Sequence, residues 1–233
     1  MSQHFSTVTP SVLFEDNHLL VLSKPSGWLV QGDRTGDPTL TDWGKKYLKE
    51  KYDKPGAVFL HPAHRLDRPV SGAVLFARTD KALSRLTTMF RERAVHKTYW
   101  ALVEQRPRQA SGELRHFLLK DEQRNLVQAF SQPRGDAKEA LLRYELLGAA
   151  GAYYVLQVFP LTGRPHQIRV QLASIGCPIA GDLKYGAPQP LPDASIGLHS
   201  RAIAFEHPVR KEPLELLAPV PATAVWQAVQ QWL

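Results

Sequence analysis

The chain alternates between short apolar runs and polar breaks that contain proline or glycine. Two apolar runs, residues 12–14 and 19–22, flank a four-residue polar turn and predict a pair of strands. Residues 105–137 contain only short apolar pieces, so we expect loops and short strands there. Further strands are expected at 73–77, 98–104, 141–147, 153–159 and 198–205, with 141–147 and 153–159 forming a hairpin closed by residues 148–151.

Apolar residues spaced three or four apart predict helices in four places. One begins with Asp37 as its N-cap, one follows a cap at Thr79, one runs from Pro165 to just before Gly176, and one covers residues 222–233. The positions expected to face the core are Leu40, Trp43 and Tyr47 in the first helix, Leu83, Leu86 and Phe90 in the second, and Ile168, Leu172 and Ile175 in the third.

Hairpins dominate over regular alternation of strand and helix, which favours an α+β fold with a mixed, largely antiparallel central sheet. No linker or repeat divides the 233 residues, so we expect one domain over residues 11–233 after a disordered tail at 1–10. The single cysteine, Cys177, excludes an intramolecular disulfide and a cysteine-based zinc site. The chain shows neither a signal-peptide pattern nor a run of about 20 apolar residues, which predicts a cytoplasmic protein without a membrane partner.

The formal net charge of +7 favours a polyanionic partner. Basic residues gather between Arg65 and Arg108 with few acids among them, which is typical of a surface that follows phosphates. Some of these residues belong to solvated helix faces. The basic positions between the two are Arg68, Arg78, Lys81, Arg85, Arg91, Arg93, Lys97 and Arg106.

A short polar loop carries the candidate chemistry. The segment from His64 to Gly72 places Asp67 between Arg65 and Arg68, immediately before an apolar run. Two guanidinium groups favour the ionised form of a carboxylate between them, and a loop that leads into a strand is rigid yet reachable. This suits a nucleophile or base that acts on a polyanion. Spacing alone fits equally well a carboxylate that caps the strand beside two surface arginines.

This segment resembles the HRLDxxTSG signature of the RluA-type RNA pseudouridine synthases. Five further segments follow in that family's order. They are Lys24-Pro25-Ser26-Gly27, Lys97-Thr98-Tyr99, the stretch from Gly163 to Arg169, the stretch from Gly181 to Gly186, and Leu198-His199. The similarity extends from about Val12 to about Pro221. It has two departures, since Val70 stands where threonine is usual and Pro165 where threonine or serine is usual.

The resemblance implies a single catalytic domain with a cleft across its sheet, without the extra N-terminal RNA-binding domain of some relatives. It implies isomerisation of uridine to pseudouridine in structured rRNA or tRNA. The base leaves its stack, which costs a few kcal/mol, and is rejoined to the ribose through carbon 5. No atom is gained or lost, so we expect neither a cofactor nor a metal. We also expect a monomer.

The resemblance implies roles for individual residues as well. Asp67 is the indispensable carboxylate, acting at the sugar or at the base, and Arg169 is its ion-pair partner. Tyr99 stacks on the target base, and its hydroxyl could move a proton. Arg65 enters the RNA stack where the target leaves. Further RNA contacts are expected from Arg68, Lys97, Arg164 and His166, and an apolar wall of the base pocket from Leu198.

Simpler interpretations of these residues remain open. Tyr99 could be a core tyrosine, Arg169 a surface arginine on an amphipathic helix, and Arg65 a plain phosphate contact. His61 and His64 with Asp67 also resemble the ligands of a metal-dependent hydrolase, although prolines interrupt any helix that would align them. A basic RNA-binding module that has lost catalysis is the other alternative. A carboxylate and a tyrosine at the expected motif positions argue against it.

Overall fold

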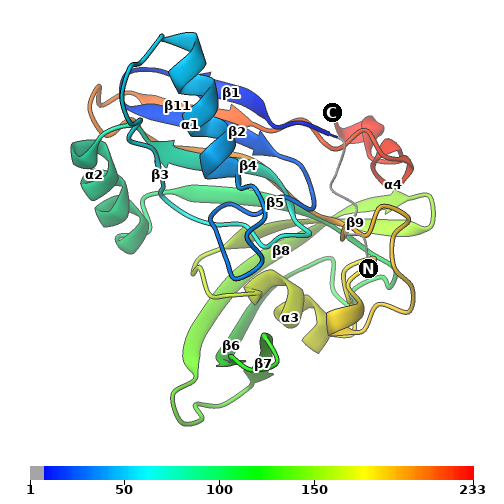
Figure 1. Cartoon of the computed structure of the whole chain (residues 1–233). Helices are drawn as coiled ribbons and strands as arrows, with labels where there is room; N and C mark the ends of the chain where they lie inside the picture. The colour runs from blue at the N-terminus through cyan, green and yellow to red at the C-terminus, as the bar shows by residue number, and fades with distance from the viewer. Residues whose placement is uncertain (1–7) are drawn as a thin grey trace. The chain divides into compact units, whose positions relative to one another are not determined.

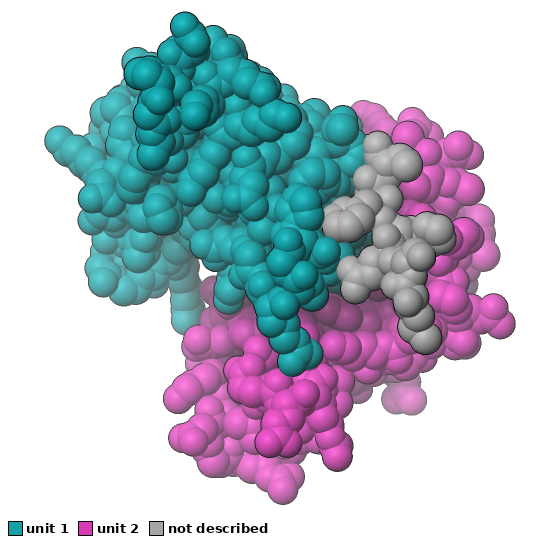
Figure 2. Space-filling view, viewed as in Figure 1, with its two compact units in different colours: residues 1–96, 200–221 teal, residues 97–199, 222–233 magenta. Residues whose placement is uncertain are grey.

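The computed structural model describes residues 8–233 (Figure 1). It contains two compact units, coloured separately in Figure 2: unit 1 is Met1–His96 with Ser200–Pro221, and unit 2 is Lys97–His199 with Ala222–Leu233. Most of the tail predicted at 1–10 lies outside the described residues. Within the described part, no helix is long and apolar enough to cross a membrane. The expectation of one catalytic domain stays a prediction.

Unit 1 is built on a sheet in the order β1-β2-β4-β10, with β3 added to β4 and β11 to β10. The bounds are β1 Ser11–Glu15, β2 Leu19–Lys24, β3 His61–Pro62, β4 Ser71–Ala77, β10 Leu198–Glu206 and β11 Pro213–Leu217. The antiparallel β1–β2 pair confirms the strands predicted around the first turn. The strand predicted at 198–205 is present, but β11 follows it and pairs with it.

Strand β2 is apolar on both sides because helices cover both faces of this sheet. Leu19 and Val21 belong to a core cluster with Ala82 and Leu86 of α2 (Asp80–Arg91). Residues at alternate positions of a strand point to opposite faces, so Leu20 and Leu22 lie on the other side. There they approach Gly44 of α1 (Leu40–Lys51), which crosses the strands in Figure 1.

Helix α1 begins two residues later than the sequence predicted. Its N-cap is Thr39, whose hydroxyl accepts a hydrogen bond from the Asp42 N–H at 3.1 Å, while the Asp42 carboxylate accepts from the Thr39 N–H. Because of this reciprocal capping box, the N-cap of the helix is Thr39 and not Asp37 as expected. The buried face is Leu40, Gly44 and Leu48, and the predicted core residues Trp43 and Tyr47 are half-buried, stacked on each other at 5.5 Å.

Unit 2 contains a second run of strands in the order β5-β9-β8-β6-β7. Their bounds are β5 His96–Val103, β6 Ser111–Asp121, β7 Leu126–Phe130, β8 Lys138–Ala150 and β9 Tyr153–Pro160. The β8–β9 hairpin confirms the prediction. The expectation of only short strands in 105–137 was wrong, because β6 is 11 residues long. Most of its side chains are exposed or half-buried, and its apolar residues form only one short run, residues 117–119.

The helices of unit 2 are short. Helix α3 (Gln167–Ser174) ends where predicted, with Gly176 in the left-handed conformation at φ 78°. The prediction of one helix over residues 222–233 was wrong. That segment forms α4 (Ala224–Gln227) and a separate 3-10 turn, Gln230–Trp232.

Gly72 gives a direct test of this packing, because it joins the polar loop to β4. Its φ is +115°, and a Cβ there would lie 2.3 Å from the carbonyl oxygen of Ser200. We expect Gly72→Ala to lower the free energy of unfolding by more than about 3 kcal/mol, since a strained φ alone costs about 1–3 kcal/mol. Gly36→Ala is the matched control, with φ +73° and open space around it. Equal losses for the two variants in denaturant titrations would contradict the close approach.

Candidate active site

Asp67 lies in the turn that leads into β4. Its carbonyl oxygen accepts a hydrogen bond from the Val70 N–H at 3.1 Å, which closes the turn. Leu66 and Val70 on either side are buried, whereas Asp67 is half-buried and Arg65 is exposed. The turn is therefore anchored by apolar side chains and presents its carboxylate. Because Val70 is buried, a valine fits where the family usually has threonine.

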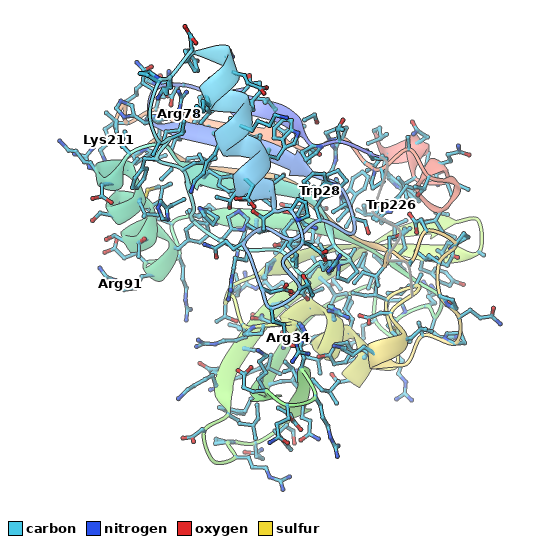
Figure 3. The ribbon with its side chains drawn as sticks, in the orientation of Figure 1. Trp28, Arg34, Arg78, Arg91, Lys211 and Trp226 are labelled. Carbon is cyan, nitrogen blue, oxygen red and sulfur yellow. The ribbon has the colours of Figure 1, made fainter. Side chains whose placement is uncertain are left out.

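The buried side chain of Lys24 is hydrogen-bonded to the backbone of this turn. Lys24, the last residue of β2, is 1% exposed, and its Nζ donates to the carbonyl oxygens of Pro25 at 3.2 Å, Trp28 at 2.8 Å and Arg68 at 3.1 Å. Trp28 is labelled in Figure 3. The three acceptors match the three N–H donors of a protonated lysine. Lys24 thus ties the segment after β2 to the residue that follows Asp67.

Further contacts join the same two segments, here named the Lys24 loop (residues 24–28) and the Asp67 loop (residues 64–70). Gly27 N–H donates to the Arg68 carbonyl at 2.9 Å, and Arg68 Nε donates back to the Gly27 carbonyl at 3.0 Å. Ser26 Oγ donates to the Pro69 carbonyl at 3.2 Å. Arg68 also forms an ion pair with Asp37 at 2.8 Å. Together these contacts between the Lys24 loop and the Asp67 loop are named the clamp. Holding the two loops together is the observed role of Arg68, and its RNA contact stays a prediction.

The charges of these loops act on one another. Burial lowers the pKa of Lys24 to about 7, the charge of Asp67 opposes this shift, and the charge of Arg68 adds to it. Lys24 and Asp67 are therefore close enough to interact electrostatically.

The histidines near Asp67 do not form the metal cluster that the hydrolase alternative requires. His64 Nε2 accepts a hydrogen bond from the Leu75 N–H at 3.1 Å, so that nitrogen is already used. The His61 ring lies against Phe59, with ring centroids 4.6 Å apart. Between residues 8 and 233, no three His, Cys, Asp or Glu side chains are grouped as metal ligands. The geometry gives the hydrolase alternative no support.

In unit 2, Arg169 lies in α3 and His166 is the residue that precedes this helix. Arg169 is 6% exposed, so the surface-arginine interpretation is wrong. Its Nε and Nη2 donate to the two carboxylate oxygens of Asp182 at 2.7 and 2.8 Å. Tyr185 contacts both residues: its hydroxyl lies 2.7 Å from His166 Nδ1, and its ring lies 5.1 Å from the Arg169 guanidinium. Arg169 and Asp67 belong to different units, and their pairing stays a prediction.

The loop before α3 is fixed by Gln167, a residue to which the sequence assigned no role. Its side-chain oxygen accepts from the Thr162 hydroxyl at 2.7 Å and from the Arg164 N–H at 3.0 Å. Its Nε2 donates to the Leu141 carbonyl at 3.0 Å. Arg164 itself is exposed, as its predicted RNA contact requires. Pro165 is also exposed, so the departure from the usual motif is accommodated at the surface.

The remaining candidates lie on strands. Tyr99 stands opposite Val158 in the β5–β9 pair and is 7% exposed, and its neighbour Trp100 is buried too. The core-tyrosine interpretation therefore stays open beside base stacking. Burial lowers the pKa of Lys97 in the same strand. Leu198 is buried at the start of β10, and its place in a base pocket stays a prediction.

Part of the predicted basic surface is structural. Arg78, labelled in Figure 3, is nearly buried and pairs with Glu15 at 3.1 Å. Arg85 Nη1 donates to the carbonyl of Pro208 at 2.8 Å. Neither guanidinium belongs in a surface that follows phosphates, which corrects the sequence interpretation. Several of the others are exposed: Arg65, Lys81, Arg91, Arg93, Arg106 and Arg108.

Comparison with known proteins identifies the family. A family profile described as RNA pseudouridylate synthase matches residues 18–174, more than half of the chain. The chain belongs to the RNA pseudouridylate synthase family. The chain is 36% identical over 211 residues to the dual-specificity RNA pseudouridine synthase RluA of Pasteurella multocida, and the match covers 89% of this chain and 92% of that protein. It is also 36% identical to ribosomal large subunit pseudouridine synthase C of Vibrio vulnificus, but spans only 65% of its length.

Solved structures give the same fold. The human RNA pseudouridylate synthase domain containing 4 matches with a TM-score of 0.75 at 25% identity, over 94% of this chain and 92% of that one. The human RNA pseudouridylate synthase domain containing 1 matches with a TM-score of 0.70 at 24% identity, over 99% of this chain and 97% of that one. The predicted α+β fold with a mixed, mostly antiparallel sheet is confirmed. The activity of the family is that of an isomerase, as predicted.

Lys24 should make stability depend on pH. Its ordinary pKa of 10.5 falls to about 7 in the folded protein. Between these values the unfolded chain binds a proton that the folded chain lacks, so the contribution of Lys24 to the free energy of unfolding rises with pH. Below about pH 7 both states are charged, and the contribution is constant at its least favourable value.

The measurement is denaturant unfolding of wild type and Lys24→Met from pH 6 to pH 10. The difference between them should move in favour of wild type as pH rises through this window. Lys46→Met is the control for loss of a lysine at an exposed position of α1. A Lys24 difference that is as flat as the control's would show that the ammonium is not perturbed by burial.

Proposed function

We propose that this chain converts uridine to pseudouridine in structured rRNA or tRNA, with Asp67 as the catalytic carboxylate. The relatives support this RNA class, since one is named a dual-specificity RNA enzyme and another a ribosomal large subunit enzyme. The observation that carries the assignment of Asp67 is the clamp between the Lys24 loop and the Asp67 loop. A carboxylate on a turn held at several backbone positions needs little reorganisation at the moment of reaction.

The chemistry requires the ionised carboxylate by either route. Asp67 attacks carbon 1′ of the ribose as the bond to uracil nitrogen 1 breaks, or it removes a proton from the nucleoside and the same bond breaks. The base then turns and carbon 5 bonds to carbon 1′, which releases the Asp67 carboxylate in the first route and is followed by return of the removed proton in the second. Carbon 5 finally loses its proton and nitrogen 1 gains one, so no atom is gained or lost.

We propose that Arg169 pairs with Asp67 and that Tyr99 stacks on the target base. The pair with Asp182 uses two of the five N–H donors that a guanidinium carries. Stacking a base on an aromatic ring contributes about 1–3 kcal/mol. Leu198 forms the wall of the base pocket opposite Tyr99, and Arg65 enters the RNA stack where the target base leaves. Four residues contact the RNA backbone: Arg68, Lys97, Arg164 and His166.

Compartment and assembly belong to the proposal as well. We propose a cytoplasmic monomer. One relative, from Xenopus tropicalis, is named pseudouridylate synthase RPUSD4, mitochondrial, so location varies among related proteins.

Asp67→Asn should abolish pseudouridine formation while leaving the fold and RNA affinity nearly unchanged. The two side chains are almost isosteric, but an amide can act neither as a base nor as a nucleophile. The measurement pairs pseudouridine yield on rRNA and tRNA transcripts with RNA affinity at fixed salt. Asp37→Asn is the control, because it changes a carboxylate that pairs with Arg68 in the same region. Appreciable turnover by a folded Asp67→Asn variant would refute the assignment.

RNA affinity should fall steeply as salt rises, because exposed arginines replace counterions on the phosphates. Each neutralised phosphate contributes a slope of roughly −0.7 to −0.9 in log affinity against log salt. Arg164→Gln should make the measured slope shallower by about one such unit. Arg210→Gln is the matched control, since Arg210 is already paired with Glu212 at 2.7 Å. Identical slopes for the two variants would remove Arg164 from the RNA contacts.

A further inference from the structure

Tyr185 lies at the meeting point of three segments of unit 2. It ends the 3-10 turn Leu183–Tyr185, and its hydroxyl oxygen accepts a hydrogen bond from the Val127 N–H of β7 at 3.0 Å. The same oxygen lies 2.7 Å from Nδ1 of His166, the residue that precedes α3. One hydroxyl therefore links β7, the 3-10 turn and the beginning of α3.

Hydrogen-bond counting indicates the direction of the bond to His166. The backbone N–H of Val127 can only donate, so it occupies one lone pair of the Tyr185 oxygen. The hydroxyl keeps its single proton, and Nδ1 at 2.7 Å is a fitting acceptor for it. If Nδ1 accepts, a neutral imidazole carries its proton on Nε2. His166 then presents an N–H donor, which suits contact with an RNA oxygen.

The ring of Tyr185 constrains Arg169 at the same time. The guanidinium carbon lies 5.1 Å from the ring centroid, within the range of a cation–π contact. Asp182 holds the guanidinium through two hydrogen bonds, and its own carbonyl accepts the Tyr185 N–H at 3.0 Å. One short turn thus supplies both groups that orient Arg169.

We infer that Tyr185 is a positioning residue for this reaction: it fixes the proton of His166 on Nε2 and the orientation of Arg169, and ties both to β7. The inference rests on the proposed function, which places His166 and Arg169 at the RNA. Tyr185 acts through these two side chains and needs no contact of its own with the reacting atoms.

The experiment compares Tyr185→Phe with Tyr144→Phe. The first keeps the ring and its contact with Arg169 but loses both hydrogen bonds of the hydroxyl. The second removes a hydroxyl in the same unit that donates a long hydrogen bond, 3.5 Å, to the Gln109 carbonyl. We expect Tyr185→Phe to lower kcat roughly 10- to 100-fold with little change in KM, because a displacement of about 1 Å in a site can cost that much. Tyr144→Phe should turn over like wild type.

A second readout does not depend on turnover. Nitrogen NMR of the His166 imidazole should show Nδ1 unprotonated and Nε2 protonated in wild type and in Tyr144→Phe. Tyr185→Phe should give a mixture of the two tautomers. A wild-type His166 with its proton on Nδ1, or a spectrum unchanged in Tyr185→Phe, would overturn the inference, and so would a Tyr185→Phe variant with wild-type kcat.

These results separate the inference from the proposed function. Arg169→Lys is measured in the same assay. If Arg169→Lys and Asp67→Asn both keep wild-type turnover, the proposed site assignment fails, whatever the His166 spectra show. If those two variants lose turnover while Tyr185→Phe keeps it, the site stands and the positioning role of Tyr185 is refuted.

Discussion

The ammonium group of Lys24 is the constraint on which the candidate site of unit 1 depends. It is buried at the end of β2 and donates to three carbonyl oxygens, one of them 44 residues away on Arg68. A buried charge is tolerable only when its hydrogen bonds are satisfied. The backbone of the Asp67 loop is therefore held at the one position where these bonds can form, and its carboxylate is presented beside a positive charge.

Unit 2 follows the same physical logic. Arg169 is buried and is matched by Asp182, which is 1% exposed, so the ion pair is complete within the unit. Removing one partner of such a pair leaves an uncompensated buried charge, which costs about 3–5 kcal/mol. Both charged groups are thus oriented by the protein itself. Their geometry is set by folding, before any RNA is bound.

The sequence predicted those elements whose apolar pattern is complete. Strands β2 and β4 are buried on both faces, and their unbroken apolar runs allowed both strands to be predicted. The length of β6 was missed because only one of its residues, Leu118, is buried and its apolar run is short. The start of α1 was misplaced because Asp37 and Thr39 are both good caps, and only the bond between Thr39 and Asp42 decides between them.

The motifs were readable from the sequence, but the contacts around them were not. The order of the segments identified the family, and the role of Asp67 is proposed from the segment that resembles the family signature. Nothing in the spacing shows that Lys24 reaches the carbonyl of Arg68, because that contact depends on the pairing of β2 with β4. Asp182 and Tyr185 lay in a recognised motif, yet their partners are 13 and 19 residues away in sequence. Such contacts are made by tertiary folding and leave no periodic signal.

The central claim is that this chain itself makes pseudouridine at defined uridines. The most direct measurement incubates the purified protein with unmodified rRNA and tRNA transcripts and maps pseudouridine at single-nucleotide resolution. The account predicts stoichiometric conversion at one or a few uridines that lie in structured RNA and can leave their stack. Transcripts that bind the protein but stay free of pseudouridine at every position would contradict it.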